Sequence, residues 1–206
     1  DFVTFKASQA KPIALKQKYH GVSTQITGYI KNVRVPFNVD IGVGDVIIPK
    51  AEWRNIQTQL NGYEKSEILT YSLESTIAEK LDAILKRFEL TGRMKDFYDI
   101  YYLSKTFNFD GLKLETAIQE TLQNRGTAYE KDSFDRVLAL ADDADMQTKW
   151  RYFLKTLRDA PVPFSEVIEG IDVYLGPVWE AIVAENEFTK KWKASEAQWQ
   201  SNLDKV

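Results

Sequence analysis

The chain has 206 residues, 44% of them hydrophobic, and a formal net charge of −3 at pH 7. This length can bury a substantial core in one domain or in two modest ones. The absence of cysteine excludes disulfide frameworks and thiolate metal sites. The single histidine, His20, excludes histidine-cluster zinc sites and disfavours a Ser/His hydrolase. The negative charge argues against broad nucleic-acid affinity, which needs a basic surface.

Neither a membrane segment nor a secretion signal is evident. His20 lies in Tyr19-His20-Gly21, and we expect it in a surface turn. The sequence contains no apolar run of about 18 residues and no signal-peptide pattern. We therefore expect a cytoplasmic protein without a membrane span.

The first third of the chain carries strand patterns. A short strand is expected at residues 2–5, and two longer ones at residues 23–30 and 33–41, joined by a turn at Lys31-Asn32. Pro36 leaves at least one side of the third strand locally unpaired. Side chains alternate between the two faces of a strand. One face of the third strand carries Val35, Phe37, Val39 and Ile41, and the other carries Arg34, Asn38 and Asp40.

A glycine-rich turn follows Asp40, with the sequence Ile41-Gly42-Val43-Gly44-Asp45. Glycines beside an aspartate at a strand end permit close approach to a ligand or metal, but they also suit an ordinary hairpin turn. The segment is not a dinucleotide fingerprint, because the third glycine and the following helix are missing. A loop then leads to a last strand at residues 67–71.

Residues 72–91 carry the periodicity of an amphipathic helix, with Ser72 as N-cap and Gly92 as the terminator. Lys80 lies at the edge of the apolar stripe, and two interpretations remain. The side chain could extend its ammonium to water, or the ammonium could lie in a cleft and meet a phosphate or carboxylate. The apolar face carries Leu73, Ile77, Leu81, Ile84, Leu85 and Phe88, and the solvent face Asp82, Lys86 and Glu89.

A second helix is expected from Arg93 to Leu103, with its polar residues confined to the first two turns. Lys95, Asp96 and Asp99 share one side of this helix. These residues could form local ion pairs, Arg93 with Asp96 and Lys95 with Asp99. They could equally line a polar pocket beside a large apolar face.

The rest of the chain reads as helical. Helices are expected at residues 110–124, 145–158 and 165–175, with a rigid break at 159–163 and a separate helix starting at Pro177. We interpret the tryptophans near the C-terminus as packing anchors before any base-stacking role. They are Trp179, Trp192 and Trp199.

Three motifs occur in a fixed order. They are Val39-Asp40-Ile41-Gly42-Val43-Gly44-Asp45, then Ala78-Glu79-Lys80-Leu81-Asp82-Ala83-Ile84, then Arg93-Met94-Lys95-Asp96-Phe97-Tyr98-Asp99. In order and spacing they resemble the AbiEii/AbiGii toxin family of nucleotidyltransferases, as does the later Leu175-Gly176-Pro177-Val178. The resemblance covers essentially the whole chain.

The resemblance implies a toxin of a toxin–antitoxin or phage-abortive system that transfers nucleotides, in some members onto tRNA ends. It implies Mg²⁺ and a nucleoside triphosphate as cofactors, and a cognate antitoxin as partner. By position, Asp40 resembles the third carboxylate of the metal site, Lys80 the nucleotide-contacting lysine, and Asp96 the remaining essential acid. Arg93, Lys95 and Asp99 would support Asp96 and take part in nucleotide binding.

One departure from the family concerns its opening motif, a glycine-rich Gly-Gly-Thr/Ser segment and an Asp-x-Asp pair that holds two metal ions. No aspartate pair follows Gly21-Val22-Ser23 at the family's spacing. We therefore expect the gene product to extend upstream of Asp1. We also expect this chain alone to be inactive, and to self-associate through exposed strand edges.

The sequence thus predicts an α+β protein with a partial polymerase-β-like nucleotidyltransferase sheet followed by a helical domain. The expected domains are residues 1–71 and 72–206. The predicted function is transfer of a nucleotide from a nucleoside triphosphate to an RNA, with tRNA among the candidates, or to a protein. The alternative is a non-catalytic helical module that contacts RNA or protein through its basic edge and its C-terminal tryptophans.

Overall fold

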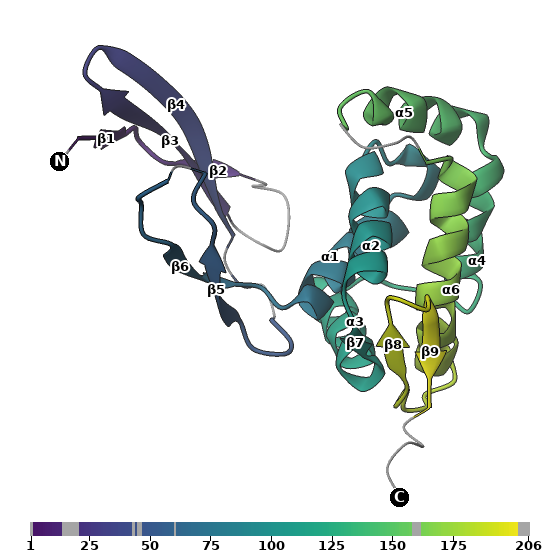
Figure 1. Ribbon diagram of the computed structural model, residues 1–206. Helices are drawn as coiled ribbons and strands as arrows, with labels where there is room; N and C mark the ends of the chain where they lie inside the picture. The colour runs from purple at the N-terminus through teal and green to yellow at the C-terminus, as the bar shows by residue number, and fades with distance from the viewer. Residues whose placement is uncertain are drawn as a thin grey trace, which may run out of the picture. The chain divides into compact units, whose positions relative to one another are not determined.

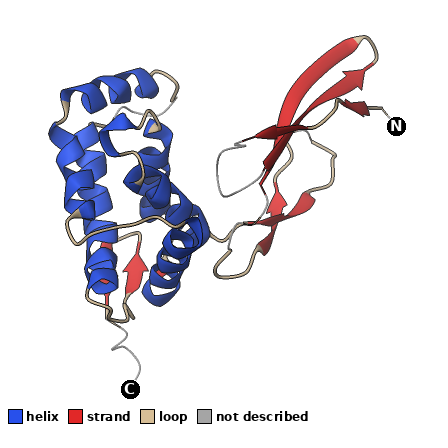
Figure 2. Cartoon of the chain, turned by 180° about the vertical axis from the view of Figure 1, so that it is seen from behind, coloured by secondary structure: helices blue, strands red, loops and turns tan. Residues whose placement is uncertain are grey.

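The computed structural model describes residues 2–13, 21–42, 44, 47–59, 61–157 and 162–201. His20, Asp45 and most of the expected break at 159–163 lie outside the described residues. Two compact units are present, residues 1–45 and 46–206. The described chain combines antiparallel sheets with helices, so the predicted α+β class is confirmed (Figures 1 and 2).

The first unit is an antiparallel sheet around a long hairpin (Figure 1). The central strand pairs along its full length with the strand that follows the Lys31-Asn32 turn, as the sequence predicted. On its other side it pairs with two short strands, and the second of them, at residues 11–13, was not among the predicted strands. The strands are β1 (Thr4–Ala7), β2 (Lys11–Ile13), β3 (Gly21–Ile30) and β4 (Val33–Gly42).

The apolar face of β4 is open to solvent. Val35, Phe37 and Ile41 are 48%, 43% and 48% exposed, and Phe5 on β1 is 64% exposed. An edge-to-face contact between the rings of Phe5 and Phe37 is the main aromatic contact on this sheet, with the ring centroids 6.3 Å apart. The alternation of apolar residues therefore sets a common face, but it produces no buried hydrophobic core among the residues of this unit that the structure describes.

The second unit begins with a hairpin of β5 (Glu52–Ile56) and β6 (Ser66–Thr70), of which the sequence predicted only the second strand. Ser72 joins this part of the chain to the helices. Its hydroxyl accepts a hydrogen bond from Ser75 N–H at 3.1 Å and donates one to the Ile48 carbonyl at 2.9 Å. The predicted N-cap is therefore confirmed, and it also fixes the loop that precedes β5.

The helices of this unit enclose one hydrophobic core, which lies between residues of every long helix (Figure 2). Asp110 and Gly126 delimit the third helix as N-cap and left-handed C-cap, close to the predicted ends. No helix in the described residues is long and apolar enough to cross a membrane. The helices are α1 (Leu73–Leu85), α2 (Met94–Thr106), α3 (Gly111–Arg125), α4 (Ser133–Leu138), α5 (Ala144–Leu154) and α6 (Phe164–Val183), with 3₁₀ turns η1 (Phe88–Leu90) and η2 (Ala139–Asp142).

Three predicted helix boundaries are wrong, and one of them is the end of the helix expected at residues 145–158, which ends at Leu154. The first helix ends at Leu85 and not near Gly92, because η1 follows it and Phe88 adopts a φ of +41°. The expected separate helix at Pro177 is the second half of α6, which runs through the proline. Pro177 removes one backbone hydrogen bond, but apolar residues from Phe164 to Ile182 are buried along the whole helix and outweigh that loss.

A small sheet, rather than helix, occupies the region of the last two tryptophans. It consists of β7 (Phe109–Asp110), β8 (Lys191–Lys193) and β9 (Gln198–Gln200) (Figure 1). Trp192 is 2% exposed and donates a hydrogen bond to the Ser104 carbonyl at 2.6 Å. Trp199 donates to the Tyr174 carbonyl at 2.8 Å, and Trp179 is 4% exposed. The prediction that these side chains are packing anchors is confirmed.

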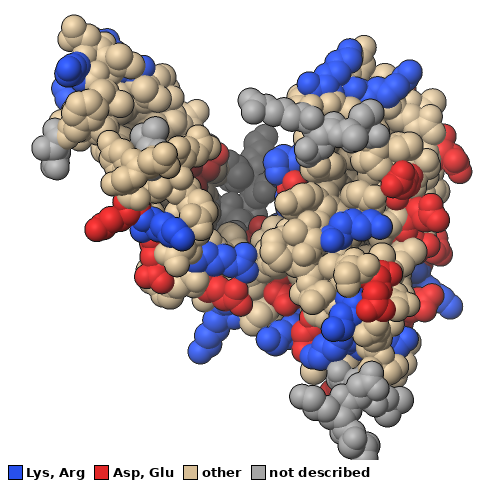
Figure 3. Space-filling view, in the orientation of Figure 1, with Lys and Arg blue, Asp and Glu red and all other residues tan. Residues whose placement is uncertain are grey.

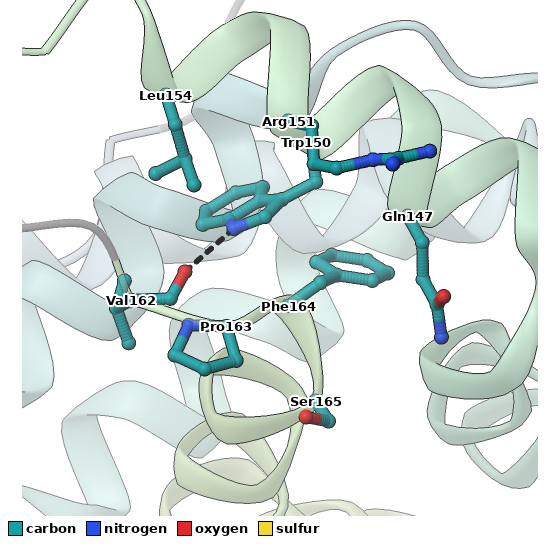
Figure 4. A pocket seen from close by; sticks show the side chains of 8 residues that line it. All are labelled: Gln147, Trp150, Arg151, Leu154, Val162, Pro163, Phe164 and Ser165. Atoms are coloured by element: carbon teal, nitrogen blue, oxygen red, sulfur yellow. Dashed lines mark hydrogen bonds between the residues drawn. The ribbon is translucent and has the colours of Figure 1, made fainter.

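Trp150 attaches α5 to the start of α6. Its indole N–H donates to the Val162 carbonyl at 2.8 Å, and its ring lies 5.3 Å from that of Phe164 (Figure 4). Trp150 is 2% exposed and therefore belongs to the core, and it also lines a pocket between α5 and the start of α6 (Figure 4).

The packing at Gly111 gives a test of this fold. A methyl group there would lie 2.6 Å from both the Lys190 carbonyl oxygen and the Phe188 ring. We expect Gly111→Ala to lower stability by about 1–3 kcal/mol, read as a fall of about 2–4 °C in Tm per kcal/mol. Gly92→Ala is the control, because nothing lies within 4 Å of that position. Equal melting curves for both variants would contradict the packing described.

Candidate active site on helices α1 and α2

Lys80 extends from α1 towards α2. Its side chain is 18% exposed, and its Nζ lies 3.3 Å from Asp96 Oδ1 and 2.5 Å from Asp99 Oδ2. The two carboxylates lie one turn apart on α2 and therefore project from the same side of that helix. Of the two interpretations, the structure supports the second: the ammonium is held by carboxylates and does not simply extend to water.

Two further cations complete the cluster. Arg93 Nε lies 2.7 Å from Asp96 Oδ2, and Lys95 Nζ lies 2.6 Å from Asp99 Oδ2. The predicted ion pairs at i,i+3 and i,i+4 are therefore both confirmed. Arg93 and Lys95 are 54% and 71% exposed, whereas Asp96 is only 5% exposed. The carboxylates therefore lie on the buried side of the cluster, and Arg93 and Lys95 lie on its solvent-exposed rim.

The cluster has an excess of positive charge, with three cations and two carboxylates. It suits recognition of an anion such as a phosphate group better than coordination of a metal ion. No group of three acidic or histidine side chains in the described residues could hold a metal. Asp96 and Asp99 are neutralised by cations and do not fit as magnesium ligands in this arrangement.

Asp82 was predicted on the solvent face of its helix, and this prediction is wrong. Its side chain is 2% exposed and lies 3.1 Å from Lys86 Nζ and 3.2 Å from Arg125 Nη1. Thr127 donates a further hydrogen bond to its other oxygen. Arg125 also lies 3.0 Å from Glu79, so it links two carboxylates of α1 that flank Lys80.

The helical period placed Asp82 opposite the apolar stripe, but α3 packs on that side of α1 and covers it. The sequence carries one signal of this arrangement, the basic residue Arg125 beside the helix-terminating Gly126. Because Arg125 and Thr127 lie more than 40 positions away from Asp82 in sequence, helical periodicity on its own could not reveal the contact.

Lys149 of α5 is another residue that sequence reasoning missed. Its Nζ donates to the Thr91 carbonyl at 3.1 Å, and the Thr91 hydroxyl accepts from the Arg93 backbone N–H at 3.1 Å. Thr91 is fully buried. The start of α2, where the ion-paired residues lie, is thereby attached to α5.

Asp40 lies near the end of β4, opposite Ser23 of β3, and its side chain is exposed. It belongs to the first unit, whereas Lys80 and Asp96 belong to the second. Lys80, Asp96 and Asp99 therefore come together in the structure. The expectation that Asp40 joins them stays a prediction.

A comparison with known protein families gives a match over most of the chain. The family model for the nucleotidyl transferase AbiEii toxin of type IV toxin–antitoxin systems matches residues 1–185. The chain belongs to this family. It is a nucleotidyltransferase toxin, with a nucleoside triphosphate as substrate and a cognate antitoxin as partner. A comparison with curated proteins gives no match.

Asp82 provides a test of the network beside Lys80 in this AbiEii-family chain. Asp82→Asn removes the charge from a buried carboxylate with cationic partners, which costs about 3 kcal/mol. We expect Tm to fall by about 6–12 °C. Asp132→Asn is the matched control, since Asp132 is exposed and makes no capping hydrogen bond. Thermal denaturation of both variants measures the difference, and equal Tm values would contradict the account.

Proposed function

We propose that this chain binds the phosphates of a nucleoside triphosphate at Lys80 and takes part in transferring the nucleotide to an RNA, with tRNA ends as the first candidate. A protein hydroxyl is the other acceptor. The observation that carries the proposal is the Lys80 ammonium, held in a partly buried cluster with one net positive charge. Such a charge, desolvated and fixed in position, suits a phosphate oxygen.

The chemistry needs positioning and charge neutralisation more than covalent assistance. The acceptor hydroxyl attacks the α-phosphorus and gives its proton to solvent water, while the bond from the α-phosphorus to the bridging oxygen breaks and pyrophosphate leaves. An ammonium has three N–H donors, so Lys80 keeps one for a phosphate while Asp96 and Asp99 orient the others. Arg93 and Lys95, which are more exposed than Lys80, suit phosphate charge that lies beyond the reach of the ammonium.

Magnesium is the metal expected for the family, and we propose Asp40 as one of its ligands. Magnesium prefers oxygen ligands such as carboxylates. The exposed carboxylate of Asp40 fits that preference, whereas the ion-paired Asp96 and Asp99 do not. We assign no step of the transfer to the metal.

We propose that the 206 residues alone transfer nucleotides poorly. Two-metal transfer requires carboxylates that bridge both ions, and no aspartate pair follows Gly21-Val22-Ser23 at the family's spacing. Incubating the chain with Mg²⁺, each labelled nucleoside triphosphate and total tRNA tests this proposal, alongside a version extended into the upstream reading frame. Transfer by the 206 residues at the rate of the longer version would contradict it.

The role of Lys80 is tested by binding, independently of transfer. We expect Lys80→Ala to weaken binding of a labelled nucleoside triphosphate about tenfold, in line with about 1.5 kcal/mol for a hydrogen bond to a charged group. Binding by the unaltered chain should also weaken as salt rises. Lys113→Ala, at an exposed position on α3, is the control. Unchanged affinity in the Lys80 variant, measured by equilibrium dialysis, would overturn its assigned role.

We also propose weak self-association through the outer edge of β4. Ile30 and Val33 close a two-residue turn, so they exchange hydrogen bonds, and so does every second pair after them. Pro36 and Asn38 therefore direct their backbone away from β3, towards an edge with which no described strand pairs. Such an edge is a template for another chain, although Pro36 offers no N–H and limits the pairing.

Asn38→Pro tests this edge, because it removes an outward N–H and leaves the bonds to β3 intact. We expect the unaltered chain to show a mean mass that rises with concentration in light scattering. The variant should remain closer to the monomer mass. A monodisperse monomer at all concentrations of the unaltered chain would show that the edge does not pair.

A further inference from the structure

A shallow groove of about 450 Å³ separates the start of α2 from α5. It will be called the α2–α5 groove. Its walls come from two helices that are far apart in sequence, and none of its residues was singled out for binding except Arg93 and Lys95. It is lined by Gly92, Arg93, Met94, Lys95, Lys149, Tyr152 and Phe153.

Three of these residues are cations. Arg93 and Lys95 are 54% and 71% exposed, and each is ion-paired with one carboxylate, so each retains further N–H donors for an anion. Lys149 adds the third positive charge from α5. The lining contains no acidic residue. Figure 3 shows Lys and Arg side chains gathered over α5, while acidic and basic side chains mix over the rest of the helical unit.

Aromatic rings lie in the groove and next to it. Tyr152 is 65% exposed, and Lys155 Nζ lies 4.8 Å from the centre of its ring. Phe153 contacts Tyr98 with ring centroids 5.8 Å apart, and Tyr98 stacks on Tyr102 at 6.2 Å. Tyr102 is 51% exposed. Exposed tyrosines interleaved with cations suit bases and phosphates of a single strand.

We propose that the α2–α5 groove binds a single-stranded segment of the RNA acceptor, with a phosphate among Arg93, Lys95 and Lys149 and a base on Tyr152. This inference rests on the proposed transfer to RNA and adds the surface that would hold the acceptor. The groove is continuous with the candidate site, because Asp99 binds both Lys95 and Lys80. A phosphate bound at Lys95 would therefore lie close to the ammonium proposed to hold the nucleotide.

A single strand fits this surface better than a duplex or a protein. A duplex keeps its bases stacked inside and offers mainly phosphates, so the exposed ring of Tyr152 would gain nothing. An acidic protein partner would match the cations, but the aspartate and glutamate side chains that supply its charge carry no ring to stack on Tyr152, whereas each nucleotide supplies both a phosphate and a base. The protein's overall charge of −3 confines any binding to a local patch of this kind.

The experiment measures fluorescence anisotropy of a labelled single-stranded oligoribonucleotide of about eight nucleotides, titrated with the full chain. We expect Tyr152→Ala to weaken binding about tenfold, the order measured for loss of one base–aromatic stack. Tyr63→Ala is the matched control, since Tyr63 is 66% exposed against 65% for Tyr152. Its affinity should equal that of the unaltered chain.

Lys149→Gln tests the phosphate contact through salt dependence. We expect the slope of log affinity against log salt to fall by about one unit relative to the unaltered chain. Lys113→Gln, on the exposed side of α3, should keep the original slope. Because Lys149 also donates a hydrogen bond to the Thr91 carbonyl, the melting temperature of each lysine variant is measured as well. If Lys149→Gln is unstable, the comparison of the Tyr152→Ala and Tyr63→Ala variants tests the groove instead.

The outcomes separate this inference from the proposed function. Equal loss of affinity in the Tyr152 and Tyr63 variants, tighter binding of a duplex of the same sequence, or no binding of the single strand would overturn the groove. Transfer of nucleotides to tRNA would stand in each of these cases. If instead the single strand binds through Tyr152 but nucleotides are transferred only to protein, the groove stands as an RNA site and the acceptor assignment fails.

Discussion

The Lys80 ammonium, held between Asp96 and Asp99, is the interaction on which the candidate site depends. A carboxylate that is 5% exposed is costly to keep charged without a partner. Asp96 has two such partners, one from its own helix and one from α1. Any shift of α1 along α2 would separate Lys80 from both carboxylates. Charge compensation thus fixes the relative position of the two helices as well as the direction of the lysine.

A second network makes α1 rigid from its opposite side. Arg125 lies at the end of α3 and contacts both Glu79 and the buried Asp82. Glu79 and Asp82 flank Lys80 in sequence, so α1 is held by α2 through one residue and by α3 through its neighbours. A site built between helices that are fixed in this way needs little rearrangement before it binds an anion, which reduces the entropic cost of binding.

Local signals predicted a good part of this structure. Ser72, the Lys31-Asn32 turn, and the Asp110 and Gly126 caps each work through contacts within a few residues, so the sequence reveals them directly. The ion pairs on α2 were also predictable, because they obey helical spacing. The three motifs, in their fixed order, indicated the family, and the family match confirms that prediction.

Contacts between distant segments explain the errors. Pro177 marks a helix start by local rules, yet α6 continues through it because both halves bury apolar side chains in the same core. The segment with Trp192 and Trp199 was predicted to be helical, but the two residues pair with each other on a small sheet. Each indole also donates a hydrogen bond to a carbonyl far away in sequence. Burial of Asp82 depends on Arg125 and Thr127, which no local pattern connects to it.

The shared carboxylate of Asp99 has a consequence for how the site and the α2–α5 groove interact. Lys80 and Lys95 both bind the same oxygen of Asp99, at 2.5 and 2.6 Å. A phosphate that draws Lys95 into the groove leaves Asp99 to Lys80 alone and strengthens the hold on that ammonium. A phosphate bound to Lys80 correspondingly compensates part of the ammonium's charge, which weakens its attraction for Asp99 and strengthens the contact of Asp99 with Lys95. Linkage requires the two effects on affinity to be equal. An RNA strand in the groove should therefore change the affinity for the nucleotide by the same factor by which the nucleotide changes the affinity for the strand.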